Sequence, residues 1–211
     1  MRIGVLLALA AALSWGSDRI ETFGRTWAVP FASDWKVESG QGTPILTLMQ
    51  GREPLPGPRR PFNFALTDPG PYGRLTIEAE MMATTRSFIV VFAYRDEAHF
   101  DYAHLSTDTA AQQPVHNGIF HVYGGERVRI SSEAGPAALA EIGRWYRVKL
   151  EHDARSGSVR VTVDGREVPA LTAVDMSLGA GKIGLGSFNE TARFRGVRIT
   201  VEPVTAAPVK R

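Results

Sequence analysis

Short segments in which apolar and polar residues alternate dominate the chain, and turn residues separate one segment from the next. The clearest example is SVRVTVDGREV at positions 158–168, where the first three valines share one face and Arg160 and Thr162 the other. Alternation with a period of two is typical of half-buried antiparallel strands. The Asp164-Gly165 pair supplies the positive backbone angles of a tight hairpin. This stretch therefore predicts two strands joined by a short turn.

The same pattern recurs along most of the chain, with turns at the spacing expected of a sandwich or barrel. No segment has the periodicity of a convincing amphipathic helix, and 135–143 is at most one helical turn. We expect about a dozen strands, in the segments 34–40, 43–50, 62–67, 74–82, 87–95, 100–106, 118–124, 127–133, 145–153, 158–168, 182–188 and 194–202.

One of these segments differs from the rest. SFIVVFAY at 87–94 is apolar on both faces, which indicates a central strand that is covered on each side. We expect its neighbours in the sheet to be the segments immediately before and after it.

Proline marks the longest irregular connection. The stretch 51–71 holds six of the 13 prolines in the chain. Because proline cannot donate to a strand ladder, this stretch predicts a long loop around one edge strand. We expect the loop to lie within the domain, since the segments on both sides of it are needed to complete a sandwich.

The composition narrows the class of protein. The 211 residues include no cysteine, which excludes the small scaffolds that disulfides hold together, so the fold must rest on a sizeable core. The formal net charge is +2, and the basic residues are scattered singly along the predicted strands. Nucleic acid is therefore not expected as a partner, because phosphate binding requires clustered lysine and arginine.

The first 17 residues resemble a secretory leader. Arg2 precedes an apolar run from Ile3 to Leu13, and small residues follow it. The run falls short of the roughly 20 residues that span a bilayer, so we expect a signal peptide and no stable membrane span. The prediction is a secreted or periplasmic protein with one domain at 18–202 and a disordered tail at 203–211.

Most of the candidate functional residues lie between positions 99 and 121, a stretch that holds four of the five histidines. Alternation places Tyr102 and His104 on one face of their strand, and His121 and Tyr123 on one face of theirs. These four side chains share a surface if the apolar residues between them, Ala103, Leu105, Phe120 and Val122, all point into the core. Neighbouring strands lie about 4.8 Å apart, so the rings would then converge on one ligand.

Three interpretations of this run remain open. Tyrosine stacks on sugar faces and imidazole bonds to hydroxyl groups, which favours a ligand-binding cleft. Tyrosine and histidine also fill half-buried strand faces in many proteins. A transition-metal site is the third interpretation, although no His-x-His or His-Glu-x-x-His spacing supports it. His99 and His152 are not expected to join the others.

Four quoted stretches resemble a known superfamily. LTIEAEMM, FIVVFAYRDEAHFDYAHLS, GRWYRVKLEHDARSGSVRVTVDGREV and GKIGLGSFNETARFRGVRI follow one another between residues 74 and 201. Their order resembles the concanavalin A-like lectin/glucanase superfamily, and most of all bacterial laminin-G-like and 3-keto-disaccharide hydrolase-like domains. The resemblance implies an all-β fold, a two-sheet antiparallel jelly-roll β-sandwich, whose concave face commonly receives carbohydrate.

The resemblance does not bring a catalytic motif with it. Glycoside hydrolases of this superfamily carry Glu-x-Asp-x-x-Glu on one strand, whereas this chain has only Glu78 and Glu80 in TIEAEM, which fit a solvated outer face equally well. Structural calcium is common among resembling domains, and loops such as SFNET at 187–191 offer oxygen ligands, but no spacing nominates a site.

Three functions follow from these observations. The first is glycan binding on the concave face. The second is a carbohydrate-active enzyme, a glycoside hydrolase or polysaccharide lyase, in which His104 with a near-neutral pKa acts as base beside Tyr102. The third is a laminin-G-like module that binds a protein partner. The candidate ligand-binding residues are Tyr94, Tyr102, His104, His116, Asn117, His121 and Tyr123.

Overall fold

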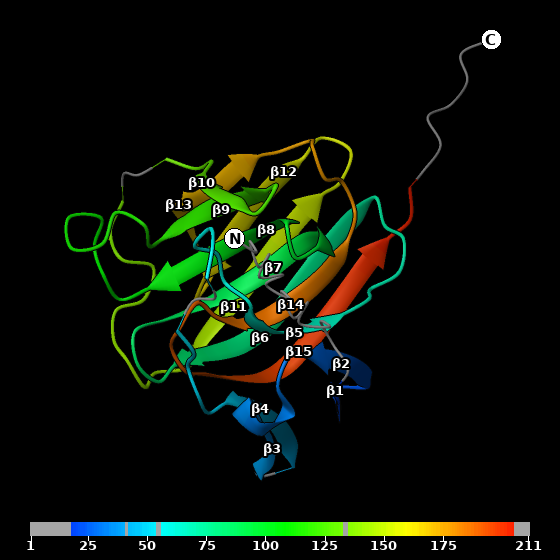
Figure 1. The fold of residues 1–211 in the computed structure, drawn as a ribbon, viewed down its shortest axis with the longest axis vertical. Coiled ribbons are helices and arrows are strands. Elements are labelled where there is room, and N and C mark those ends of the chain that lie inside the picture. Colours follow the sequence, from blue (N-terminus) through cyan, green and yellow to red (C-terminus); the bar gives the residue numbers. More distant parts are fainter. Residues whose placement is uncertain (1–17, 41, 54–55, 133–134, 205–211) are drawn as a thin grey trace, which may run out of the picture.

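A computed structural model describes residues 18–40, 42–53, 56–132 and 135–204 (Figure 1). The predicted signal peptide, and the predicted tail from residue 205 onward, lie outside the described residues. Within the described ranges, no helix is both long and apolar enough to cross a membrane.

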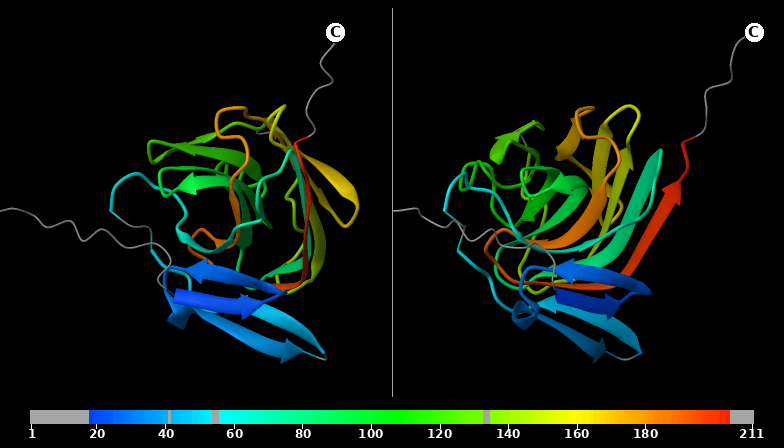
Figure 2. Two further views of the ribbon diagram at one scale, coloured as in Figure 1. Left: turned by 90° about the vertical axis from the view of Figure 1, so that its right-hand side faces the viewer. Right: turned by 45° about the vertical axis from the view of Figure 1, so that its right-hand side comes forward.

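The described residues form two antiparallel sheets packed face to face, as predicted, and Figure 2 shows the two layers. A single turn of 3-10 helix, η1 (Ala32–Asp34), precedes the third strand. Sheet A contains, in spatial order, β1 (Asp18–Thr22), β2 (Arg25–Val29), β5 (Asn63–Thr67), β14 (Lys182–Ser187), β7 (Ser87–Asp96), β8 (His99–Ser106), β9 (Gly118–Tyr123) and β10 (Glu126–Arg129). Sheet B contains β13 (Arg166–Val174), β12 (Ser158–Val163), β11 (Tyr146–Asp153), β6 (Arg74–Ala83), β15 (Ala192–Glu202), β4 (Thr43–Leu48) and β3 (Trp35–Gly40).

The alternation of apolar and polar residues did not predict the first hairpin. Strands β1 and β2 pair around a two-residue turn at Phe23 and Gly24, whose φ angles are 54° and 68°. Both angles lie in the left-handed region that type I′ hairpins use. Phenylalanine is not a usual residue for that conformation, so the sequence carries no clear turn signal there.

Strand β13 continues beyond the predicted hairpin, through Pro169, to Val174. It is an edge strand of sheet B, paired on one side with β12, and the register shifts between Arg160 and Thr162 of that partner. A proline is tolerated there because an edge strand leaves one row of its backbone groups unpaired.

Strand β7 is a central strand with both faces buried, as its apolar sequence predicted. Its neighbours are β8 and β14, so the prediction that the preceding segment pairs with it is wrong. That segment is β6, which lies in the opposite sheet. The predicted edge position of β5 is also wrong, because β2 pairs with its free side.

Two apolar layers explain the sequence of β7. Phe88, Val90 and Phe92 point into the core between the sheets. Ile89 and Val91 point the other way, into a second buried layer on the outer face of sheet A. This outer layer also contains Phe64, Leu66, Tyr94, Phe100, Tyr102, Phe120 and Val122.

Candidate ligand-binding site

The register of β8 and β9 decides which of the predicted site residues share a face. Tyr102 lies opposite Phe120, and Asp101 lies opposite His121. Phe120 packs in the outer layer with Tyr102, whereas Ile119 packs between the sheets. Residues opposite one another in neighbouring strands point to the same side of the sheet. His121 therefore faces the space between the two sheets, whereas Tyr102 faces the outer layer.

The prediction that Tyr102, His104, His121 and Tyr123 share one surface is therefore wrong. It assumed that Phe120 and Val122 point into the core between the sheets, and both lie in the outer layer instead. Strand β9 is apolar on both faces around His121, so alternation alone could not tell which face is the core.

Tyr102 and His104 remain neighbours, but both are closed to solvent, with exposures of 0% and 1%. The Tyr102 ring stacks on Phe120 with centroids 5.2 Å apart, and its hydroxyl accepts a hydrogen bond from Arg127 Nη1 at 3.3 Å. Burial raises the pKa of Tyr102 above its ordinary value. No substrate reaches these two rings in the described conformation.

The pKa of His104 departs from the near-neutral value that a general base requires. Burial lowers it well below the ordinary value, and the charges of His116, Arg127 and Arg129 lower it further. The imidazole is therefore neutral at physiological pH, and its Nε2 bonds to Ser87 Oγ at 2.9 Å. The geometry supports a structural role for His104 rather than the catalytic one.

Tyr94 and Tyr123 lie away from this pair. Tyr94 packs on Phe100 in the outer layer, with centroids 5.7 Å apart, and lines a separate pocket of about 270 Å³ with Lys182. Tyr123 is exposed at the end of β9, where it stacks on His121 with centroids 5.6 Å apart.

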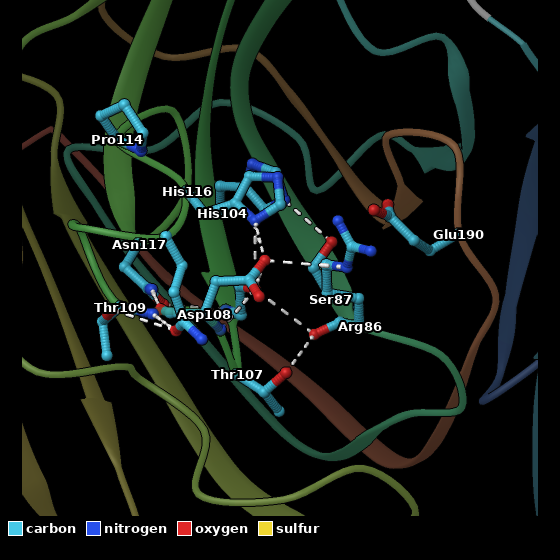
Figure 3. Close-up of polar contacts among 12 residues, drawn as sticks. Arg86, Ser87, His104, Thr107, Asp108, Thr109, Pro114, His116, Asn117 and Glu190 are labelled. Carbon is cyan, nitrogen blue, oxygen red and sulfur yellow. Dashed lines mark hydrogen bonds and ion pairs between the residues drawn. The ribbon is translucent and has the colours of Figure 1, made fainter.

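His104, His116 and Asn117 do come together, and Figure 3 shows them with their partners. The two imidazole rings are 4.4 Å apart between centroids. His116 Nδ1 lies 2.8 Å from Asp108 Oδ2 and 3.2 Å from Ser106 Oγ. Burial lowers the pKa of His116, although the hydrogen bond to Asp108 opposes this effect.

Asn117 holds the loop that carries Asp108. Its Oδ1 accepts hydrogen bonds from the backbone N–H groups of Ser106 at 2.9 Å and Ala138 at 3.0 Å, and its Nδ2 donates to the Asp108 carbonyl. Its φ of 51° lies in the left-handed region, which asparagine tolerates better than most residues. The buried Asn117 side chain thus holds the Asp108 backbone, while His116 and Ser106 hold its carboxylate from behind.

In front of Asp108 a pocket of about 420 Å³ opens at this end of the sandwich. Arg86 Nε lies 3.7 Å from Asp108 Oδ2, and Glu190 Oε2 accepts a hydrogen bond from Ser187 Oγ at 3.0 Å. Figure 3 shows Asp108 below the histidine pair, with Arg86 and Glu190 to its right. The lining residues are Thr85, Arg86, Thr107, Asp108, Ile142, Asn189 and Glu190.

Sequence reasoning did not find Arg86, Asp108 or Glu190. They come from three loops: the β6–β7 connection, the β8–β9 connection and the β14–β15 connection. No local motif links them, and only the fold brings them to one end. Two hints pointed to this end: the predicted placement of His116 and Asn117 at the mouth of the β8–β9 connection, and the oxygen ligands of the 187–191 loop, which contains Glu190.

The carboxylates of Glu78 and Glu80 lie on the outer face of sheet B, in agreement with the solvated-face interpretation. Glu80 Oε2 lies 2.9 Å from Arg195 Nε, and Glu78 Oε2 lies 3.7 Å from Arg198 Nη2. Both glutamates are therefore paired on that face.

Several solved structures have a similar fold. The carbohydrate binding module CBM66 from Bacillus subtilis superimposes with a TM-score of 0.56 at 16% identity, over 82% of this chain and 94% of that one. The likeness shows that the fold of this chain is a two-sheet jelly-roll sandwich. A protein of unknown function with a galectin-like fold, also from Bacillus subtilis, matches with a TM-score of 0.52 at 16% identity, over 80% of this chain and 86% of that one.

A GH43 protein from Bacillus licheniformis matches 88% of this chain and 38% of its own length, with a TM-score of 0.57 and 12% identity. Identities this low show a shared fold and nothing further. No family model matches the sequence, and no curated protein matches it either.

Proposed function

We propose that this chain is a secreted or periplasmic jelly-roll domain that binds a carbohydrate at the pocket of Arg86, Asp108 and Glu190. The observation that carries the proposal is the preorganisation of Asp108 at this pocket. Buried groups hold Asp108 from behind, through His116, Ser106 Oγ and the Asn117 side chain, while the pocket itself is open.

The lining chemistry suits a sugar. Carboxylates accept hydrogen bonds from sugar hydroxyl groups, and a guanidinium donates to hydroxyl and ring oxygens. Exposed Ile142 adds an apolar surface for the C–H face of a ring. Side chains already fixed by the protein lose little conformational entropy when the ligand binds.

In this proposal the predicted ligand-binding residues act in different ways. His116 and Asn117 position Asp108 and do not contact the sugar. Tyr102 and His104 form the packed support beneath them. Tyr94, His121 and Tyr123 lie outside the pocket and take no part in it.

The names of two structural neighbours support a carbohydrate as the class of ligand. One is named a carbohydrate binding module and another a GH43 protein. The fold supports many functions, so the site must carry the assignment.

One observation favours the enzymatic alternative. Asp108 and Glu190 both line the same pocket, and glycoside hydrolases use two carboxylates around the scissile bond. An enzyme would release new reducing ends or unsaturated products, whereas a binding domain would retain the glycan unchanged.

A glycan array followed by calorimetry with the best ligand tests the proposal. Arg86→Ala and Asp108→Asn should each weaken binding by about tenfold or more, because each removes a charge-assisted hydrogen bond. The matched control is Arg144→Ala with Asp164→Asn, a surface pair whose Nη2 and Oδ2 are 2.7 Å apart at another site. This control should bind as the wild type does.

Several outcomes contradict the proposal. One is that no glycan binds the wild-type chain. Another is that the Arg86 and Asp108 variants bind as tightly as the control. Product release from a polysaccharide panel, abolished by Glu190→Gln, would favour the enzyme instead, and capture of a protein ligand in the absence of any glycan would favour the laminin-G-like alternative.

A further inference from the structure

A second polar cluster lies between the sheets, on the face of β8 and β9 that points away from the outer layer. Asp101 of β8 and His121 of β9 are opposite one another in the ladder. Asp175 follows the last residue of β13 in sheet B. His121 Nδ1 lies 2.7 Å from Asp101 Oδ1 and 2.7 Å from Asp175 Oδ2.

The cluster sets two carboxylate oxygens against one ring nitrogen. A single Nδ1–H cannot make two full hydrogen bonds, so one of these oxygens is left without a full donor. Among the described residues, the ion pairs of Asp101 and Asp175 involve no lysine or arginine. Asp101 is 1% exposed, so its charge is held away from water.

The donor atoms suit a transition metal. One imidazole nitrogen and two carboxylate oxygens lie within 4.8 Å of one another. Zinc takes such nitrogen and oxygen ligands at about 2.0 to 2.2 Å and accepts three protein ligands with water in the fourth position. Calcium prefers about six to eight oxygen ligands, which this set does not supply.

The protein also orients the ligands. Asp175 Oδ1 accepts the backbone N–H of Ser177 at 2.7 Å, which leaves Oδ2 directed at His121. The Tyr123 ring stacks on the His121 imidazole at an interplanar angle of 24°. Such supporting contacts hold metal ligands in one rotamer.

We propose that Asp101, His121 and Asp175 bind a zinc ion that joins sheet A to the end of β13 in sheet B. The site would fasten the two sheets together in a chain that has no cysteine for a disulfide. It shares no residue with the sugar pocket, and it stands whether or not the chain binds carbohydrate.

Titration of the untagged full chain with Zn²⁺, after removal of bound metal with a chelator, tests the proposal. Calorimetry should give one zinc per chain. Zinc should raise the midpoint of thermal unfolding, the chelator should reverse the rise, and Ca²⁺ at the same concentration should produce none. Co²⁺ should give visible absorption bands with the intensity of a four-coordinate site.

Two variants separate this site from general histidine binding. His121→Gln should abolish the zinc response and the Co²⁺ bands. The matched control is His99→Gln, which removes another imidazole paired to a carboxylate, with His99 Nδ1 2.8 Å from Asp96 Oδ1. The control should bind zinc as the wild type does, because that pair lacks a second carboxylate.

The proposal is overturned if the wild-type chain binds no stoichiometric zinc, a result that does not depend on whether any variant folds. It is also overturned if His121→Gln folds and binds zinc with unchanged affinity, or if His99→Gln loses the response.

Discussion

The imidazole rings of His104 and His116 lie against each other, with their centroids 4.4 Å apart, at the end of β8. Each ring has a hydroxyl partner, Ser87 for His104 and Ser106 for His116. Protonating both rings would place two positive charges in contact inside the protein, which is costly in a low-dielectric environment. We therefore expect this pair to make the fold sensitive to acid.

We predict that stability falls as the pH drops below about 6.5, the ordinary histidine pKa. Burial lowers the pKa of His104 and His116, and lowers that of His152 to about 4. A histidine with a lowered folded-state pKa binds protons more readily in the unfolded chain, so acidification favours unfolding. His152 alone should remove on the order of 3 kcal/mol between about pH 6.5 and 4.

Urea unfolding at a series of pH values measures this loss. His104→Gln and His152→Gln should each flatten the decline in unfolding free energy below pH 6.5, because glutamine does not titrate. His99→Gln is the control for the substitution itself, since His99 is the first residue of β8 and its side chain is 33% exposed rather than buried. A wild-type stability that does not change between pH 7 and 4 would contradict the prediction.

An ion pair between the buried Asp34 and Arg52 holds the start of the proline-rich connection against η1. Asp34 is fully buried, and its Oδ1 accepts a hydrogen bond from Arg52 Nη2 at 2.7 Å. We predict that Arg52→Met lowers the unfolding free energy by about 2 kcal/mol, because it leaves a buried carboxylate without its cation. The loss should fall below that of a fully buried pair, since the Arg52 side chain is 31% exposed.

A double-mutant cycle checks this interpretation. Asp34→Asn combined with Arg52→Met should be more stable than the sum of the two single losses predicts, because neither charge is then left alone. Strict additivity in denaturant unfolding would show that the two side chains do not stabilise each other.

Gly186 of β14 has no room for a side chain. A Cβ there would lie 2.4 Å from the Asn63 carbonyl oxygen and 2.5 Å from Phe64 Cα, both in the neighbouring β5 backbone. We predict that Gly186→Ala costs about 3 kcal/mol or more, because backbone atoms cannot move aside. Gly184→Ala should cost less, since its nearest contact is 3.1 Å. Equal unfolding midpoints for the two variants would refute the packing argument.

The role of Tyr102 is testable by two substitutions. Tyr102→Phe removes only the hydroxyl that accepts from Arg127, so we predict a loss of about 1 kcal/mol or less and unchanged glycan binding. Tyr102→Ala removes the ring that stacks on Phe120 and should cost about 3 to 5 kcal/mol. Glycan affinity measured at a temperature where both variants are folded is the check. A large loss of affinity in Tyr102→Phe would restore the predicted ligand-binding role.

Much of the fold was predictable from local pattern. Alternation predicted the antiparallel strands, because a strand with one buried face has a period of two. The apolar run at 87–94 predicted a strand covered on both sides, and β7 is one. The Phe23-Gly24 turn was not predicted, because phenylalanine rarely adopts the left-handed backbone conformation that Phe23 has here.

The sequence by itself determined an all-β sandwich and the neighbourhood of His104, His116 and Asn117, since these depend on residues close together in the chain. The tertiary structure decided on which side of sheet A His121 lies, because β9 has apolar residues on both faces. It also decided that Arg86, Asp108 and Glu190 meet at one pocket. Loops distant in sequence become neighbours only when strand order is set, and strand order depends on packing between the sheets rather than on any local pattern.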